Sequence, residues 1–273
     1  MKTINIPVFF LILAIFTFSC GPKQSTKEEV DSIDSSATET ITPVVNITLT
    51  PLTDSPEFPD ASLEMNAPGE DAQLEPGSNS FSYNVKNYEL GAQTSDTEDK
   101  GLANSGKGQH IHVILNNQPY YAHYEPEFDR ELEAGHHVIL SFLSRSYHES
   151  VKSYGASVLR QFTVGDVTAE PVDLTAPHLF YSRPKGEYKG KDTEHVLLDF
   201  YLINTKISEG GNTVRATING QEFMINKWEP QVMKGLPMGE NTIKLELLDK
   251  DGNGIPGPFN VVERTVTLSP GDA

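Results

Sequence analysis

The sequence predicts an all-β protein with two tandem immunoglobulin-like antiparallel β-sandwich modules behind a disordered acidic stalk. Beyond about residue 80, short runs of apolar and β-branched residues alternate with polar ones between Gly, Asn and Pro, and no amphipathic helix is evident. This pattern occurs twice, and each copy spans ~90 residues with about six or seven candidate strands, the size of an immunoglobulin-like sandwich. A segment rich in Ser, Thr, Pro and acidic residues precedes both copies.

The internal repeat is the most informative of these observations. Phe81 to Gln93 parallels Leu198 to Gly210, and Ile111 to Tyr121 matches Val214 to Met224 without a gap. The repeat therefore predicts a His-rich module 1 at 80–168 and module 2 at 169–273. Before them we expect a signal peptide at 1–19 and a stalk at 20–79, for the reasons that follow.

The stalk is assigned from composition. Between residues 21 and 80, Lys23 and Lys27 are the only cations against 12 acidic residues. Such a segment buries too little apolar surface to offset the entropy of ordering, so a flexible, self-repelling tether is expected.

The N-terminus has the features of an export signal. Lys2 precedes the unbroken apolar stretch Val8 to Phe16, which is too short to span a bilayer. The stretch ends in Ser19-Cys20-Gly21, which resembles the lipobox of bacterial lipoproteins, and Cys20 is the only cysteine of the chain. The resemblance implies that Cys20 is lipidated, as with palmitate, and anchors the mature protein to a membrane.

Composition excludes several classes of protein. The chain has 21 Lys and Arg against 38 Asp and Glu, a formal net charge of −17, so nucleic acid is not an expected partner. A single cysteine forbids an internal disulfide and a cysteine-rich metal cluster. No Gly-x-Ser-x-Gly, Walker loop, dinucleotide-binding fingerprint or His-Glu-x-x-His occurs, and we expect no enzymatic activity.

Histidines concentrate in module 1, where six of the chain's eight lie between His110 and His148. Asn219-Gly220 is a strong two-residue hairpin turn, and the matching Asn116-Asn117 predicts the same hairpin in module 1. Its register then predicts one face formed by residues that are apolar in both copies. The opposite face would carry His110, His112, Tyr121 and His123, where module 2 has no histidine.

These histidines suggest a copper or zinc site. Imidazoles two residues apart on one strand, with a third across the ladder, suit Cu²⁺ or Zn²⁺. We expect His110, His112 and His123 as ligands, with His137 or His148 as a fourth. The plainer interpretation is a polar outer face of the sheet that tolerates histidine, and a role in pH sensing or ligand contact is a third alternative.

Two weaker candidates lie in loops. Asp249, Asp251 and Asn253 have the spacing of the first half of a calcium loop, although a β-hairpin turn explains the same residues. The run Ser144-Arg145-Ser146-Tyr147-His148 resembles the Ser-Arg-x-His motif of forkhead-associated phosphopeptide-binding sandwiches, which makes Arg145, His148 and Arg160 candidates for contact with a peptide or anionic ligand, although an exposed, solvated loop explains the same run. Tyr121 is a further candidate for ligand contact, as one of the tyrosines that could stack on a sugar.

Taken together, the lipobox, acidic stalk and tandem modules resemble uncharacterised surface lipoproteins of the Bacteroidota type, similar sequences being sometimes labelled phosphopeptide-binding. The resemblance implies a lipid-anchored, non-enzymatic binding or scaffold protein of the cell envelope, held at the outer membrane with an unknown envelope protein or small ligand as partner. A cluster after Cys20, Lys27-Glu28-Glu29, is similar to signals for export to the outer face of that membrane.

Overall fold

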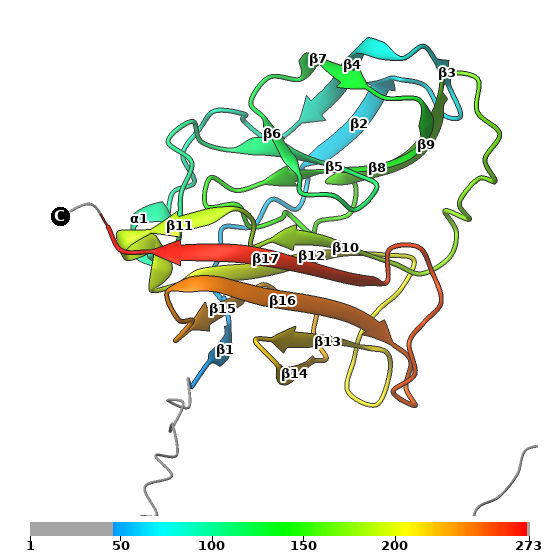
Figure 1. The fold of residues 1–273 in the computed structure, drawn as a ribbon. Helices are drawn as coiled ribbons and strands as arrows, with labels where there is room; N and C mark the ends of the chain where they lie inside the picture. Colours follow the sequence, from blue (N-terminus) through cyan, green and yellow to red (C-terminus); the bar gives the residue numbers. More distant parts are fainter. Residues whose placement is uncertain (1–45, 272–273) are drawn as a thin grey trace, which may run out of the picture. The chain divides into compact units, whose positions relative to one another are not determined.

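The computed structural model describes residues 46–271, and its regular structure is almost entirely β-strand (Figure 1). The predicted signal peptide, Cys20 and the first part of the predicted stalk lie outside the described residues. None of the helices between residues 46 and 271 has the length and hydropathy to span a bilayer.

Module 1 is a sandwich of two sheets. A three-stranded sheet has the order β2-β4-β7, and a five-stranded sheet has the order β3-β9-β8-β5-β6. A single turn of helix, α1 (Thr97–Lys100), lies between β4 and β5. The strands are β2 (Ser62–Ala67), β3 (Gln73–Leu74), β4 (Gly77–Lys86), β5 (His110–Leu115), β6 (Tyr121–His123), β7 (Glu127–Leu132), β8 (Gly135–Ser144) and β9 (Ser157–Val164).

Module 2 repeats this arrangement strand for strand. Its sheets have the orders β10-β12-β15 and β11-β17-β16-β13-β14, and the first is extended by β1 at its β15 edge. A short 3-10 turn, η1 (Gly190–Thr193), follows β11. The strands are β1 (Thr48–Pro51), β10 (His178–Arg183), β11 (Glu187–Lys189), β12 (Val196–Ile203), β13 (Thr213–Ile218), β14 (Gln221–Ile225), β15 (Gln231–Lys234), β16 (Gly239–Leu248) and β17 (Val261–Ser269).

The predicted repeat is confirmed by matching details of the two modules. In each, a short strand pairs in parallel with the last strand, and the first strand of the three-stranded core sheet carries an irregularity in its register. Asn87 and Asn204, matched in the sequence, each directly follow a strand and have positive φ, 53° and 52°. The all-β class with tandem immunoglobulin-like sandwiches is therefore correct.

The predicted extent of the stalk is wrong at its C-terminal end. Residues 48–79 form β1, β2, β3 and the start of β4, although the stalk was expected to run to residue 79. Composition averaged over the whole segment concealed short strands such as β2, in which Leu63 and Met65 alternate with exposed residues and are buried in module 1. The preceding strand, β1, pairs with β15 of module 2, so the chain contacts module 2 before it forms module 1 (Figure 1).

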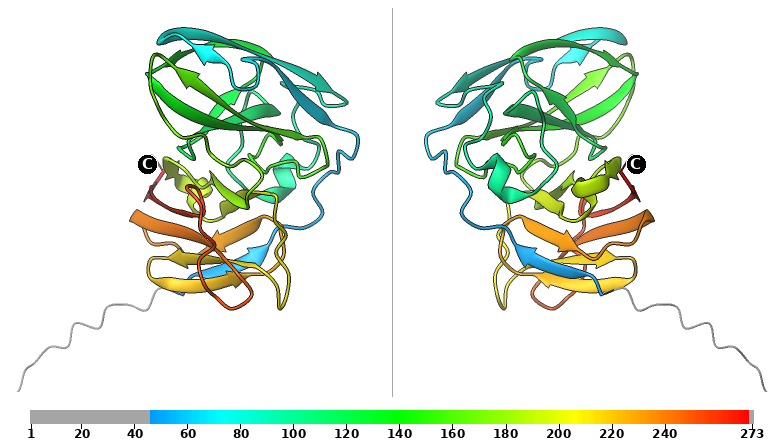
Figure 2. Two further views of the ribbon diagram at one scale, coloured as in Figure 1. Left: turned by 90° about the vertical axis from the view of Figure 1, so that its right-hand side faces the viewer. Right: turned by 90° about the vertical axis from the view of Figure 1, so that its left-hand side faces the viewer.

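Each module has its own apolar core, and a third cluster lies between them. The outer faces of β5 and β8 pack on β10 and β12, so the two modules are stacked on one another (Figure 2). This third cluster contains Ile114, Tyr120, Val138, Leu140, Phe142, Phe180, Tyr201 and Phe259. We call the region the seam.

Polar contacts fix the two modules across the seam. The side chain of Asn117 donates to the carbonyl oxygens of Leu179 and Phe259 and accepts from the amide of Tyr181, at 2.9 to 3.0 Å. The ammonium of Lys152 lies 2.7 Å from the carboxylate of Asp199, which is 1% exposed. Satisfied polar groups of this kind define one relative position of the two faces, because displacement would leave buried groups without partners.

Candidate metal centre

The hairpin of β5 and β6 differs from the predicted register by one residue. Asn116 and Asn117 both have positive φ, as a two-residue turn requires, but β5 pairs with β6 as Ile111 with His123 and Val113 with Tyr121. Residues 118–120 form no strand, and Pro119 has no amide hydrogen for a ladder. Module 2, which has Asn219-Gly220, follows the predicted pairing.

A one-residue offset moves every side chain after the turn to the other face of the sheet. Tyr120 therefore lies buried on the same face as His112, and their rings stack with centroids 3.5 Å apart. Tyr121 is 42% exposed instead. His123 packs against the Phe128 ring, away from His110 and His112, so its predicted place in the metal site is wrong.

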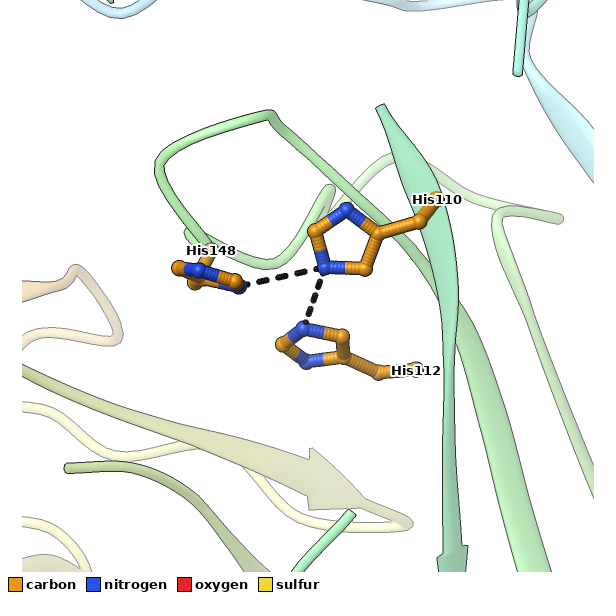
Figure 3. A group of neighbouring side chains, drawn as sticks. All are labelled: His110, His112 and His148. Carbon is orange, nitrogen blue, oxygen red and sulfur yellow. Dashed lines mark hydrogen bonds between the residues drawn. The ribbon is translucent and has the colours of Figure 1, made fainter. Parts of the chain in front are cut away.

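His148 takes the position that was expected for His123. The side chains of His110, His112 and His148 point toward one another (Figure 3), and one nitrogen of each lies within 4.8 Å of the others. Nε2 of His110 is 2.9 Å from Nε2 of His112 and 3.2 Å from Nδ1 of His148. Two imidazoles bound to one tetrahedral zinc ion place their nitrogens roughly 3.3 Å apart, so these separations are close to those of a metal site.

Different elements supply the three histidines. His110 and His112 are two residues apart on β5 and face the seam, and both are completely buried. His148 lies in the turn between β8 and β9, where its backbone has a positive φ of 71°. The site is thus closed by module 2 on one side and by this turn on another.

Hydrogen bonds from outside the cluster orient the rings of His110 and His112. Nδ1 of His110 lies 2.8 Å from the carbonyl oxygen of Gly108, which can only accept, so neutral His110 carries its proton on Nδ1 and a lone pair on Nε2. Nδ1 of His112 lies 3.4 Å from the hydroxyl oxygen of Ser182 on β10, which can either accept or donate and therefore does not fix the tautomer of His112. Outer partners of this type are characteristic of metal-bound histidine.

Without a cation, this arrangement is incompletely satisfied. The single in-plane lone pair of His110 Nε2 faces two nitrogens but can accept only one well-directed hydrogen bond. Nδ1 of His148 also lies 3.2 Å from the Tyr120 hydroxyl. A metal ion bound to this nitrogen would take the place of a hydrogen bond from that hydroxyl.

Burial keeps all three histidines neutral. It lowers the pKa of His110 to about 4 and, together with the neighbouring histidines and Arg183, lowers the pKa of His112 and of His148 well below the ordinary value. Neutral imidazole is the form that binds metal, so these ligands need no deprotonation at neutral pH.

The charges around the histidines are positive. Arg183, the last residue of β10, and Lys185, which follows this strand, lower the pKa of His110 through their charge, in addition to the larger effect of burial. Neither residue was singled out in the sequence, because both belong to module 2 and only the stacking of the modules brings them beside β5.

The other predicted ligand residues have separate surroundings. His137 stacks on Phe162, and its Nε2 lies 2.9 Å from the carbonyl oxygen of Glu133. It is therefore engaged outside the group formed by His110, His112 and His148.

Tyr121, Arg145 and Arg160, the candidate ligand contacts, share no partner. Arg145 is buried in an ion pair with Glu149, Arg160 donates to the carbonyl oxygen of Pro68, and Tyr121 lies under the guanidinium of Arg130. Each interaction belongs to local structure, and the three do not form a common site.

The candidate calcium residues form a turn. Asp249 accepts from the backbone amides of Asp251 and Asn253, at 2.9 and 2.8 Å, and Lys250 donates to the carboxylate of Asp251. This is the hairpin alternative given above. Calcium binding there stays a prediction, and nothing in the turn favours it.

Comparison with known proteins identifies no family. No family model matches the sequence, and no curated protein matches it.

Among solved structures, the fibronectin(III)-like modules of Clostridium thermocellum CbhA match with 11% identity and a TM-score of 0.27, over 76% of this chain and 94% of that chain. The Bacteroides ovatus protein SGBP-B of a mixed-linkage glucan utilization locus, solved with a heptasaccharide, matches with 11% identity and a TM-score of 0.22, over 77% of this chain and 71% of that chain.

A Parabacteroides merdae β-glucuronidase matches with 8% identity and a TM-score of 0.23, over 76% of this chain and 25% of that chain. The neighbours therefore include fibronectin(III)-like modules, a protein solved with an oligosaccharide and part of an enzyme. At these TM-scores no functional inference is drawn from the likeness.

Proposed function

We propose that this protein is a lipid-anchored, non-enzymatic binding protein of the cell envelope that holds a copper or zinc ion in the seam between its two modules. The anchor is argued from the sequence alone, from Cys20 after its apolar stretch. Replacement of Cys20 by Ser should move the protein from the membrane fraction to the soluble fraction, and an unchanged distribution would contradict the anchor.

The convergence of three neutral imidazoles on one point, two of them completely buried and that of His148 half-buried, carries the metal proposal. A backbone carbonyl outside the cluster directs the Nε2 lone pair of His110 inward, and the Ser182 hydroxyl holds the outer nitrogen of His112. Module 2 adopts the same sandwich with Thr213 and Arg215 at the positions of His110 and His112, so the fold itself does not require histidine there.

The non-enzymatic part of the proposal takes into account the two buried carboxylates of residues 46–271, which are those of Glu149 and Asp199. Glu149 receives a hydrogen bond from Ser55 and an ion pair from Arg145, and Asp199 is bound by Lys152 and the amide of Ser150. Both carboxylates are thus held in structural contacts.

The positive charges of Arg183 and Lys185 oppose a divalent ion. A singly charged ion meets half of that repulsion at the same distance. Cu⁺ is therefore included among the ions to be tested, beside Cu²⁺ and Zn²⁺, and three imidazoles are suitable ligands for each.

The test is a calorimetric titration of the metal-free full chain with Zn²⁺, with Cu²⁺, and with Cu⁺ under ascorbate. We expect one ion per chain for at least one metal. Replacement of His148 by Asn, which tolerates positive φ, should weaken binding at least about 100-fold, since removal of an outer partner alone weakens metal sites about 10- to 100-fold.

His123→Asn is the matched control, because His123 lies in the same module but outside the cluster. It should bind like the natural protein. Absence of binding by all three ions, or equal binding by the His148→Asn variant, would overturn the metal proposal.

A further inference from the structure

Three cations lie together at the seam, beside the histidine cluster but separate from it. Arg183 is at the end of β10, Lys185 follows it, and Arg264 lies on β17. Arg183 is 7% exposed, whereas Lys185 and Arg264 are half-buried. We call these three residues the cation cluster.

Uncharged groups provide the contacts of the cation cluster. Arg183 donates to the Tyr188 hydroxyl at 2.8 Å, and Lys185 donates to the carbonyl oxygen of Tyr120 at 2.7 Å. Arg264 donates to the carbonyl oxygen of Asn117 at 3.0 Å.

Aromatic rings complete these surroundings. The Lys185 ammonium lies 3.9 Å from the centroid of the Tyr120 ring, and the Arg264 guanidinium lies 4.2 Å from that of Tyr181. Within residues 46–271, no carboxylate forms an ion pair with Arg183, Lys185 or Arg264.

The same place holds buried hydrogen-bond donors without partners. Nε of Arg183, Nη1 of Arg264 and the hydroxyl of Tyr181 are all inaccessible and unbonded. Tyr181 is completely buried. A buried donor without an acceptor is rare and costly, and it commonly indicates an unseen water or ion.

Elsewhere in the described part of the chain, cations of low exposure are paired with carboxylates. Arg145 is bound to Glu149 and Lys152 to Asp199, both at low exposure. Among residues 46–271, by contrast, none of the many acidic residues forms an ion pair with the cation cluster. Like charges gathered at low dielectric repel one another unless a counterion is present.

The mutual influence of the three charges agrees with this geometry. Burial, and then the charges of Arg183 and Arg264, lower the pKa of Lys185 to about 8. The two guanidinium groups therefore act on the same ammonium.

We propose that the cation cluster binds a small inorganic anion in the seam. A compact anion such as chloride, sulfate or phosphate accepts N–H and O–H hydrogen bonds. It would neutralise the charges of Arg183 and Lys185, near the first strand of module 2, and of Arg264 on its last strand. Because Arg183 and Tyr181 are buried and only Lys185 and Arg264 extend to the surface, the site suits a compact anion. Neighbouring Asn117 belongs to module 1, so the anion would stabilise the contact between the modules.

The test measures thermal unfolding of the full chain in EDTA, with sodium gluconate replaced at constant ionic strength by sodium chloride, sulfate or phosphate. EDTA removes the metal, so this proposal and the metal proposal can fail separately. At least one compact anion should raise the melting temperature saturably, by about 3 to 6 °C at ten times its dissociation constant.

Variants identify the site. Lys185→Met should remove most of the saturable rise, whereas Lys189→Met, which removes an exposed charge from β11, should retain it. If Lys185→Met fails to fold, Arg264→Gln provides the same comparison.

Equal melting temperatures in all four salts would overturn the proposal. A non-saturating increase shared by the natural protein and both variants would also overturn it, because sulfate and phosphate stabilise proteins generally by exclusion from the surface.

Discussion

The buried histidines predict that the metal-free protein is labile to mild acid. His110 and His112 are completely buried, and in the folded protein both are neutral at pH 7. A change from pH 7.5 to pH 5 in the presence of EDTA is therefore the perturbation, and the free energy of unfolding is the quantity expected to change.

The size of the effect follows from proton linkage. The pKa of His110 is about 4 in the folded protein against an ordinary value of 6.5, so the unfolded chain binds more protons between these values and stability is lost as the pH falls through that window. At pH 5, about 1.5 units below the unfolded-state pKa and at about 1.4 kcal/mol per unit, His110 alone destabilises the fold by about 2 kcal/mol.

Other groups act in known directions. The pKa values of His112 and His148 are also lowered, so both histidines add to the loss. Burial raises the pKa of Glu149, so its protonation in acid favours the folded state and opposes them. The total loss in the free energy of unfolding depends on this balance. The contribution of His110 must therefore be measured separately, by comparison with a variant that lacks this histidine.

The assay is urea unfolding followed by the fluorescence of Trp228, the only tryptophan. Its indole packs edge-on against Tyr201 in the seam, with ring centroids 5.1 Å apart, so the signal reports on the contact between the modules. Over the same pH change, the free energy of unfolding of the His110→Phe variant should fall by about 2 kcal/mol less than that of the natural protein. Equal losses in the two proteins would refute the reasoning, whatever the stability of the variant at pH 7.5.

Three further predictions concern two polar contacts across the seam and the attachment of β1 to module 2. Lys152→Met should lower the free energy of unfolding by about 3 kcal/mol in urea titration, because Asp199 would remain buried without its cation; a loss below about 1 kcal/mol would contradict this. Asn117→Ala should cost about 2 to 4 kcal/mol and speed amide exchange across the seam, because its side chain makes three hydrogen bonds there; unchanged exchange would show that apolar packing alone holds the modules. Gly235→Ala should detach Thr48–Pro51, since φ is 78° and an added Cβ would lie 2.5 Å from a backbone oxygen next to this strand; faster exchange confined to that strand is expected, and native protection there would be the contrary result.

The fold was predictable because its signals are local. Alternating apolar residues and Gly or Asn at turns indicate strands, and the repeat shows that two sets of strands form two similar modules. The short strand around Leu63 and Met65 was missed, because composition averaged over a long acidic segment obscures six residues with regular alternation.

The candidate site was predicted in part. His110 and His112 share a face because side chains alternate along a strand, which sequence spacing determines. The third ligand depended on the register after Asn116 and Asn117, and one additional residue in the turn exchanged His123 for Tyr120 on that face.

The sequence by itself determined the all-β class, the duplication and the pairing of two histidines on one strand, since each depends on residues near one another in the chain. Only the tertiary structure decided that this face is buried and not solvated, that His148 completes the cluster, and that Arg183, Lys185 and Arg264 gather beside it. These features arise where module 1 stacks on module 2, and packing between surfaces that are distant in sequence leaves no periodic signal in either one.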